Sequence, residues 1–327
     1  METNDSTPIL QVRNLKKYFP VRRGFLQKTV HYLKAVDGVD FEINRGHTLG
    51  LVGESGCGKT TVARLILRLL TADTGEILYK GRDINTLTER LFKPLRREIQ
   101  IVFQDPYSSL NPRMTVEESI AEGVRIAGVT DRAARRRRIA QLLDRVGMPA
   151  ASAGRYPHEF SGGQRQRVGI ARALSVNPSL IICDEPVSAL DVSIQAQIIN
   201  LLKDLQDHLG LSYLFISHDL NVVSYLCSRV CVMYKGKIVE SAPAEALFDE
   251  PRHPYTQTLI ASILDPGSYA VSGGGGKTAE TTGKPQANPK GCSYYNLCPA
   301  KTPRCTQAVS HMVQVAPDHF VRCLQSE

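Results

Sequence analysis

Residues Gly53–Thr60 read GESGCGKT and fit the pattern G-x-x-x-x-G-K-[ST]. They follow an apolar run, HTLGLV at 47–52, and lead into a helical pattern, TTVARLILRLL at 60–70. A strand that enters a helix through a glycine-rich turn lets backbone N–H groups surround a phosphate, and the helix dipole favours its negative charge. The segment therefore predicts an α/β fold with a phosphate-binding loop. In such a loop Lys59 reaches the outer phosphates and the Thr60 hydroxyl ligates Mg²⁺.

The whole loop is expected to line the site of a bound phosphate chain. Its members are Gly53, Glu54, Ser55, Gly56, Cys57, Gly58, Lys59, Thr60 and Thr61. The alternative is a glycine-rich turn that matches the pattern by chance. The strand and helix patterns on either side disfavour that alternative.

A second metal contact is expected on a neighbouring strand. Residues 179–185 read SLIICDE, which is an apolar strand pattern ending in two carboxylates. Asp184 is expected to hold Mg²⁺ through water. Glu185 points differently and is suited to polarise an attacking water as general base. An ordinary acidic pair at a strand end is the alternative, and the phosphate-loop pattern makes it the weaker interpretation.

From residue 8 to about residue 240 the sequence alternates β-rich runs with helical segments. This alternation is typical of a parallel sheet covered by helices, which is the fold class we predict. The expected strands are Thr48–Val52, Ile99–Phe103, Leu180–Asp184, Tyr213–Ile216 and Val230–Met233.

Composition narrows the class of protein. Hydrophobic residues make up 42% and charged residues 22% of the 327 positions, as in globular proteins. No window approaches the ~20 apolar residues that a membrane span needs. Residues 1–8 lack a signal-peptide pattern, so we expect a protein of the cytoplasm. The net charge of +8 suits an anionic surface without choosing one, and Arg135–Arg138 are expected on the solvated face of a helix.

The segment Phe160–Arg167, FSGGQRQR, resembles the signature of ABC ATPases, although the family usually has Leu in place of Phe160. The resemblance covers about residues 9–240. It implies a P-loop NTPase domain at 8–240 with a helical subdomain at about 90–160, which binds and hydrolyses ATP with Mg²⁺. Two such domains pair head to tail in the family. The signature residues Ser161, Gly162, Gly163 and Gln164 would then close over the γ-phosphate held by the partner.

The same resemblance assigns further residues. Gln104 matches a glutamine that contacts Mg²⁺ and the attacking water, so the expected Mg²⁺ contacts are Thr60, Gln104 and Asp184. Asp191 matches the loop that crosses the dimer interface, and His218 matches the switch histidine beside the γ-phosphate. Phe19 is expected to stack on the adenine, with Tyr18 as the alternative.

Two stretches narrow the family further. QDPYSSLNPRMTV at 104–116 and HPYTQTL at 253–259 resemble the ATPases of dipeptide and oligopeptide importers. This likeness implies peptide import. The implied partners are a second and paralogous ATPase, two membrane permeases contacted by the helical insert at about 90–156, and indirectly an external peptide-binding protein. We therefore expect the chain on the cytoplasmic face of the membrane, without nucleic acid. Alternatives are an importer of nickel or another small solute, or a soluble ABC ATPase.

The C-terminal part is expected to form a separate small unit. A helical extension at 241–270 and a Gly-rich, polar linker at 271–291 precede a Cys-rich tail at 292–327. The tail cysteines are Cys292, Cys298, Cys305 and Cys323. Thiolate ligation suits a reducing cytoplasm better than disulfides do, and the tight C-x2-C pair of most zinc sites is missing. The resemblance implies a [4Fe-4S] cluster here, with Zn²⁺ or no metal as alternatives.

Overall fold

The computed structural model describes residues 8–23, 28–264, 291–308 and 310–326. Its central feature is an eight-stranded sheet in the order β11-β12-β10-β9-β3-β8-β7-β6. Five of its strands, β9, β3, β8, β7 and β6 in sheet order, run parallel to one another. Their bounds are β3 Thr48–Val52, β6 Ile99–Val102, β7 Leu180–Asp184, β8 Ser212–Ser217 and β9 Arg229–Tyr234. All five strands predicted from the sequence are therefore present, with ends that differ by one residue at most.

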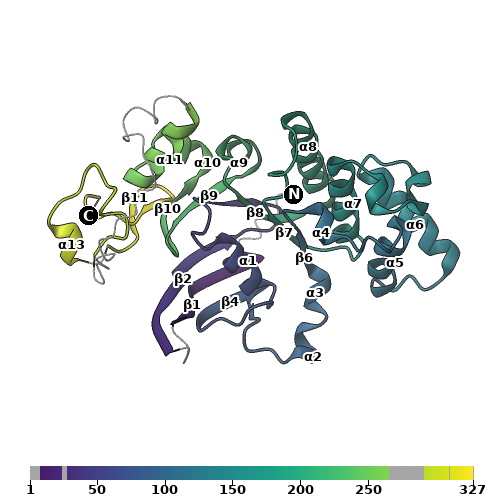
Figure 1. Ribbon diagram of the computed structural model, residues 1–327, viewed down its shortest axis with the longest axis horizontal. Coiled ribbons are helices and arrows are strands. Elements are labelled where there is room, and N and C mark those ends of the chain that lie inside the picture. Colours follow the sequence, from purple (N-terminus) through teal and green to yellow (C-terminus); the bar gives the residue numbers. More distant parts are fainter. Residues whose placement is uncertain (1–7, 24–27, 265–290, 309, 327) are drawn as a thin grey trace.

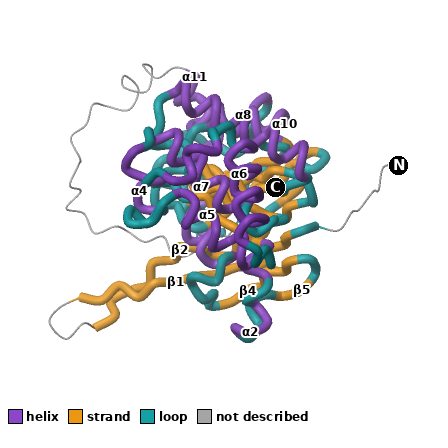
Figure 2. The backbone as a smooth tube through the Cα atoms, turned by 90° about the vertical axis from the view of Figure 1, so that its right-hand side faces the viewer, coloured by secondary structure: helices purple, strands orange, loops and turns teal. Residues whose placement is uncertain are grey.

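A second, antiparallel sheet was not predicted. It has the order β2-β1-β4-β5, and its strands are β1 Leu10–Arg23, β2 Lys28–Ile43, β4 Thr74–Tyr79 and β5 Arg82–Asp83. The paired strands β1 and β2 extend well beyond the body of the molecule (Figure 2). The basic, weakly alternating sequence of the outer part carries little strand signal, because no core covers it there.

Helices α4 to α8 gather at one end of the molecule, and α10 and α11 lie toward the opposite end (Figure 1). The bounds of the helices are α1 Lys59–Ile66, α2 Glu89–Phe92, α3 Leu95–Glu98, α4 Pro106–Ser109, α5 Val116–Ile126, α6 Arg132–Arg145, α7 Gly162–Leu174, α8 Val192–Leu209, α9 Leu220–Leu226, α10 Ala244–Asp249, α11 Pro254–Leu264 and α13 Arg304–Gln307.

Helices α5 and α6 are the longest helices within the range 90–160 of the predicted helical subdomain, and α7 begins just after it. Helix α5 begins with a reciprocal capping box between Thr115 and Glu118, which satisfies free N–H groups of its first turn. Helix α6 buries Ile139, Leu142 and Leu143, and its arginines at 135–138 lie on the exposed or half-buried face, as predicted. Strand β6 falls inside the range 90–160 but belongs to the central sheet, so the helical unit is not continuous over that range.

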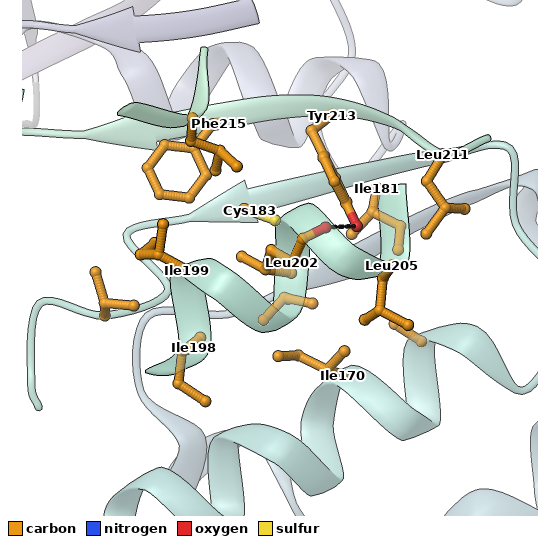
Figure 3. Packing of buried hydrophobic residues seen from close by; sticks show 14 of the residues in the cluster. Ile170, Ile181, Cys183, Ile198, Ile199, Leu202, Leu205, Leu211, Tyr213 and Phe215 are labelled. Atoms are coloured by element: carbon orange, nitrogen blue, oxygen red, sulfur yellow. Dashed lines mark hydrogen bonds between the residues drawn. The ribbon is translucent and has the colours of Figure 1, made fainter. Parts of the chain in front are cut away.

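The main core lies between the parallel strands and helices α7 and α8 (Figure 3). Ile181 and Phe215 from the sheet pack there against Leu202 of α8, and all three are fully buried. Tyr213 is also fully buried, and its hydroxyl donates to the Leu202 carbonyl at 3.0 Å. This bond satisfies the one polar group that the ring carries into the core. The core thus fixes the carboxyl ends of the strands, where the predicted site residues lie.

The C-terminal residues extend the central sheet. Strands β10 (Lys237–Pro243), β12 (His319–Val321) and β11 (Val313–Ala316) pair antiparallel beyond β9. The predicted boundary at 240/241 falls inside β10, and the Cys-rich tail joins the sheet through β12. Helices α10 and α11 occupy the predicted helical extension. The predicted linker at 271–291 lies outside the described residues, except for Gly291.

Within the described residues, no helix is both long enough and apolar enough to cross a bilayer.

Candidate active site

The loop between β3 and α1 wraps around the amino group of Lys59. Lys59 is 4% exposed, and its Nζ donates to the carbonyls of Gly53 at 2.6 Å and Glu54 at 3.0 Å. Gly53 has φ +147°, and a Cβ there would lie 2.2 Å from the Met233 carbonyl oxygen. Glycine is required because the loop packs directly on the end of β9.

A cavity of about 640 Å³ opens beside this loop. Its volume suits a nucleotide-sized ligand. Its lining comprises Phe19, Leu33, Lys34, Ala35, Ser55, Gly56, Cys57, Gly58, Lys59, Thr60, Thr61, Gln104, Glu185, Lys235 and Gly236. Most of the predicted nucleotide contacts therefore lie on one surface. Gly53 and Glu54 are not part of this lining, and their carbonyls accept hydrogen bonds from Lys59.

The two residues predicted to hold Mg²⁺ on the loop side are in contact. The Thr60 hydroxyl donates to Asp184 Oδ1 at 3.1 Å, and Asp184 is 8% exposed. Burial raises the pKa of Asp184, and the neighbouring Glu185 carboxylate raises that pKa further. A hydroxyl and a carboxylate oxygen at this distance are suitable ligands for Mg²⁺, whose charge would favour the ionised carboxylate.

Two side chains from distant segments of the chain contact the carboxylate of Glu185. Gln104 Nε2 donates to its Oε2 at 3.0 Å, and His218 Nδ1 lies 3.2 Å from the same oxygen. The backbone of Glu185 has φ +49°, which is uncommon for a residue other than glycine, and its N–H donates to the Ile216 carbonyl at 2.9 Å. Such conformations persist where the surrounding structure enforces them, and they are enriched at functional sites. Two of the three predicted catalytic residues, Gln104 and His218, thus converge on the carboxylate of the third, Glu185, at the cavity wall.

Phe19 and Tyr18 occupy different environments. Phe19 lines the cavity. The hydroxyl of Tyr18 instead donates to Asp37, and burial together with this bond raises the pKa of Tyr18 to about 12. Between the two candidates for adenine stacking, the geometry therefore favours Phe19.

The predicted signature residues lie away from this cavity. Ser161, Gly162 and Gln164 are exposed at the start of α7, where Ser161 and Gln164 form a reciprocal capping box. A Cβ on Gly163 would lie 2.4 Å from Ile194 Cγ2, so glycine allows the close approach of α8. Asp191 is exposed at the N-cap of α8. The structure thus places the signature and Asp191 side by side, on a surface apart from the chain's own loop.

Five cavity residues were not identified in the sequence analysis: Leu33, Lys34, Ala35, Lys235 and Gly236. They come from the antiparallel strand β2 and from the turn between β9 and β10. The Gly236 N–H donates to the Cys57 carbonyl at 2.9 Å, and Gly236 has φ +85°. The Lys-Gly pair after a strand signals a turn, but nothing in its sequence indicates that this turn meets the loop 180 residues earlier.

The tail cysteines lie around a second, small cavity. Cys292, Cys298, Cys305 and Cys323 all line it, and all are free thiols. Burial raises the pKa of Cys292 and of Cys323, and the nearby thiols of the set raise both further. Among the described residues, no group of three or more His, Cys, Asp or Glu side chains could hold a metal ion. The predicted metal site therefore receives no support from that geometry, although the four cysteines are brought together.

The fold and this constellation define a P-loop nucleotide hydrolase of the ATP-binding cassette class. The ABC transporter family matches residues 36–188, and the family described as "Oligopeptide/dipeptide transporter, C-terminal region" matches residues 239–305. Among solved structures, the chain is similar to the dimeric post-hydrolysis state of the ATP-binding cassette MJ0796 bound to ADP and Pi. That TM-score is 0.64 at 28% identity, and the match covers 72% of this chain and 98% of the other.

Full-length relatives narrow the class. The chain is 49% identical to the oligopeptide transport ATP-binding protein AppF of Bacillus subtilis, with 99% of each chain covered. It is 46% identical to the putative peptide import ATP-binding protein BOV_A0347 of Brucella ovis, with 98% of each chain covered. The chain therefore belongs to the ATP-binding proteins of the oligopeptide/dipeptide family of ABC transporters, and it is an ATPase.

Proposed function

We propose that this chain is the ATP-hydrolysing subunit of a peptide importer. The observation that carries the catalytic part is the convergence of Gln104 and His218 on Glu185 at the wall of the loop cavity. The peptide cargo is supported by the full-length likeness to peptide transport ATPases. Import of nickel or another small solute is the alternative cargo.

The catalytic cycle assigns a role to each side chain. ATP binds in the loop cavity with its adenine on Phe19, and Lys59 turns from the loop carbonyls to the outer phosphates. Thr60, Gln104 and Asp184 would hold Mg²⁺, which when bound would neutralise charge that develops on the phosphates. Glu185 accepts a proton from the attacking water, while His218 orients that water and contacts the γ-phosphate.

A second cassette completes the site. Ser161, Gly162 and Gln164 of the signature are exposed and lie apart from the chain's own cavity. Val192, beside Asp191, is 81% exposed. This surface suits a partner that docks head to tail, so that each signature covers the γ-phosphate of the other subunit. A paralogous ATPase is the proposed partner. ATP then holds the pair together, and hydrolysis releases it.

The permeases are proposed to dock on a groove of about 750 Å³ beside the helical subdomain. Its lining includes the apolar Phe103 and Ile126, which are 39% and 52% exposed, and the basic Arg90 and Arg97. Phe103 directly precedes Gln104, so a permease segment seated here would act on the catalytic glutamine. A short amphipathic helix with acidic ends fits this lining. Docking would place the chain on the cytoplasmic face of the membrane.

The transport proposal is tested by purifying the tagged chain from cells and identifying what accompanies it. Two polytopic membrane proteins and ATP-dependent uptake of a labelled oligopeptide into vesicles are expected. Nickel uptake without peptide uptake would favour the small-solute alternative. Association with ribosomes or DNA, without membrane proteins, would contradict transport altogether.

The tail is proposed to bind a [4Fe-4S] cluster through Cys292, Cys298, Cys305 and Cys323. The support is that all four line one cavity, whereas a single Zn²⁺ needs its thiolates converged on one ion. Such a cluster would supply electron-transfer chemistry or cross-link the tail. Protein purified without oxygen should contain iron and absorb broadly in the visible range, and Cys305→Ser should lose both. Colourless, iron-free protein, with or without zinc, would contradict the cluster.

A further inference from the structure

Three buried tyrosines connect the tail to the nucleotide site. Tyr234 ends β9, Tyr255 lies in the first turn of α11 and Tyr294 lies in the tail, and each is at most 4% exposed. The ring centroids of Tyr234 and Tyr255 are 4.6 Å apart, and the Tyr294 ring lies edge-on at 5.2 and 5.4 Å from them. These are favourable spacings for aromatic pairs. Figure 1 shows α11 and the C-terminal strands at the same end of the molecule.

The hydroxyl of Tyr255 contacts the phosphate loop itself. It accepts a hydrogen bond from the Glu54 N–H at 3.0 Å, across 201 positions of sequence. That N–H belongs to the same peptide unit as the Gly53 carbonyl, which accepts from Lys59 Nζ at 2.6 Å. The peptide between Gly53 and Glu54 is therefore held at both ends, by Lys59 on the oxygen and by Tyr255 on the nitrogen.

Nucleotide binding changes the hydrogen bonds that hold the peptide between Gly53 and Glu54. When Lys59 turns to the phosphates, the Gly53 carbonyl loses that partner. The Tyr255 hydroxyl then remains to keep the peptide in the orientation that the glycine-rich loop requires, because a peptide plane that rotates moves the N–H groups that follow it. Burial raises the pKa of Tyr255, so the group stays a neutral hydroxyl.

Tyr255 is in turn held by the C-terminal elements. Its N–H donates to His253 Nδ1 at 3.0 Å, and the His253 N–H donates to Glu240 Oε2 at 2.9 Å. The Tyr294 hydroxyl lies 3.2 Å from Thr258 Oγ1 on the next turn of α11. Tyr294 and His253 also line the cavity of the four tail cysteines. Two rings in contact thus separate that cavity from the phosphate loop.

We propose that Tyr255 is a positioning residue for the phosphate loop and that the tail, through Tyr294, sets the affinity for nucleotide by holding Tyr255. The proposal rests on ATP binding at the loop cavity. It explains why the C-terminal region packs against the catalytic core instead of forming a separate unit. A packing role alone would need the ring of Tyr255 but not its hydroxyl.

The first test uses Tyr255→Phe, which removes the hydroxyl and keeps the ring. The Kd for a non-hydrolysable ATP with Mg²⁺ should rise roughly threefold to tenfold, the worth of one neutral hydrogen bond. The KM for ATP should rise with it while kcat stays the same, as for a loss of uniform binding. Tyr234→Phe is the matched control, because it removes a hydroxyl from the same cluster, and it should leave Kd unchanged. An unchanged Kd and KM in Tyr255→Phe would overturn the proposal.

The second test measures coupling to the tail. Tyr294→Leu should raise the Kd in the wild-type background and have little further effect in Tyr255→Phe, because both act on one contact. Tyr295→Leu, the same change at the neighbouring position, should leave the Kd as it was. Equal effects of Tyr294→Leu in both backgrounds would show that the tail does not act through Tyr255, and would refute the proposal.

Thermal unfolding and a reference variant complete the design. Tyr255→Phe should unfold at nearly the wild-type temperature, since its ring contacts remain. Lys59→Ala gives the level of binding without a working loop. If the wild-type protein binds ATP no better than Lys59→Ala does, the proposed nucleotide site is refuted, and the positioning role with it. If Tyr255→Phe binds ATP as tightly as the wild-type protein does, only the positioning role is refuted.

Discussion

At the scale of single residues, the site is organised around the carboxylate of Glu185. Its backbone conformation is one that side chains other than glycine rarely adopt, and two side chains from separate loops meet its Oε2. The hydrogen bond from Gln104 and the contact with His218 hold the carboxylate in one orientation. In the proposed role of general base, a carboxylate held in this way would lose little free energy to reorientation during the reaction.

Glu185→Gln keeps the shape of this group and removes its basicity. We expect kcat for ATP hydrolysis to fall about 10²–10⁴-fold, the usual contribution of a general base. ATP affinity should be retained, which separation of bound from free labelled nucleotide would show. Lys59→Ala is the contrasting variant, because it should weaken binding itself. Substantial turnover by Glu185→Gln would remove Glu185 from the role of base.

At the scale of elements, the C-terminal region joins the core where β10, β12 and the start of α11 meet. Strand β10 presents Glu240, which is fully buried and accepts from the N–H groups of Arg252 and His253. His319 of β12 lies 2.7 Å from the same carboxylate. One buried carboxylate therefore joins β10, the start of α11 and the C-terminal hairpin. Removing any of these partners would leave buried charge unsatisfied.

His253 makes this junction sensitive to acid. Burial lowers the pKa of His253 to about 4, and its Nδ1 accepts the Tyr255 N–H. The unfolded chain binds the proton more readily, so stability is constant above pH ~6.5 and falls as the pH drops from there toward 4. Between pH 7 and 5 this residue should cost about 2 kcal/mol of unfolding free energy.

Urea denaturation at the two pH values measures this loss. His253→Asn keeps an acceptor near the position of Nδ1 and does not titrate, so its stability should depend less on pH. His208→Asn is the control, because His208 is exposed on α8, and it should keep the wild-type dependence. An undiminished pH dependence in His253→Asn would contradict the assignment.

The groove beside the helical subdomain permits a test of docking. Ile126→Glu places a charge among apolar groove residues at the end of α5, and we expect it to prevent co-purification with the permeases. ATP binding by the isolated variant should be unchanged, because the groove is separate from the loop cavity. Leu69→Glu is the matched control: Leu69 is 61% exposed and lies outside the lining of the groove. Wild-type permease association by Ile126→Glu would place the docking surface elsewhere.

At the scale of the whole molecule, the sequence predicts well the features whose signal lies within one short segment. The loop at 53–60 and the strand ending in Asp184 and Glu185 carry their signals within ten residues, and both lie where they were predicted. Gln104 and His218 were assigned through a family resemblance, since no local pattern brings them to Glu185. The bond from Tyr255 to Glu54 joins two segments 201 positions apart and has no signal in either one.

The antiparallel sheet and the packing of the tail were harder to predict from the sequence, for physical reasons. The outer part of the hairpin β1–β2 lacks a covering core, so its side chains do not alternate between apolar and polar. The tail was expected as a separate unit after a polar linker. It joins the central sheet instead, because three-residue β12 pairs with β10 and His319 meets a buried Glu240. Pairings of this length leave no readable pattern in the sequence.

The central claim is that nucleotide is clamped between the loop of one cassette and the signature of its partner, and photochemical labelling tests it most directly. In the complete transporter, this chain would carry Lys59→Ala, so that a non-hydrolysable ATP photoactivatable at its γ-phosphate loads only at the partner's intact loop. Irradiation should label this chain within residues 161–164. Labelling confined to the partner, with those residues untouched at saturating nucleotide, would contradict the account.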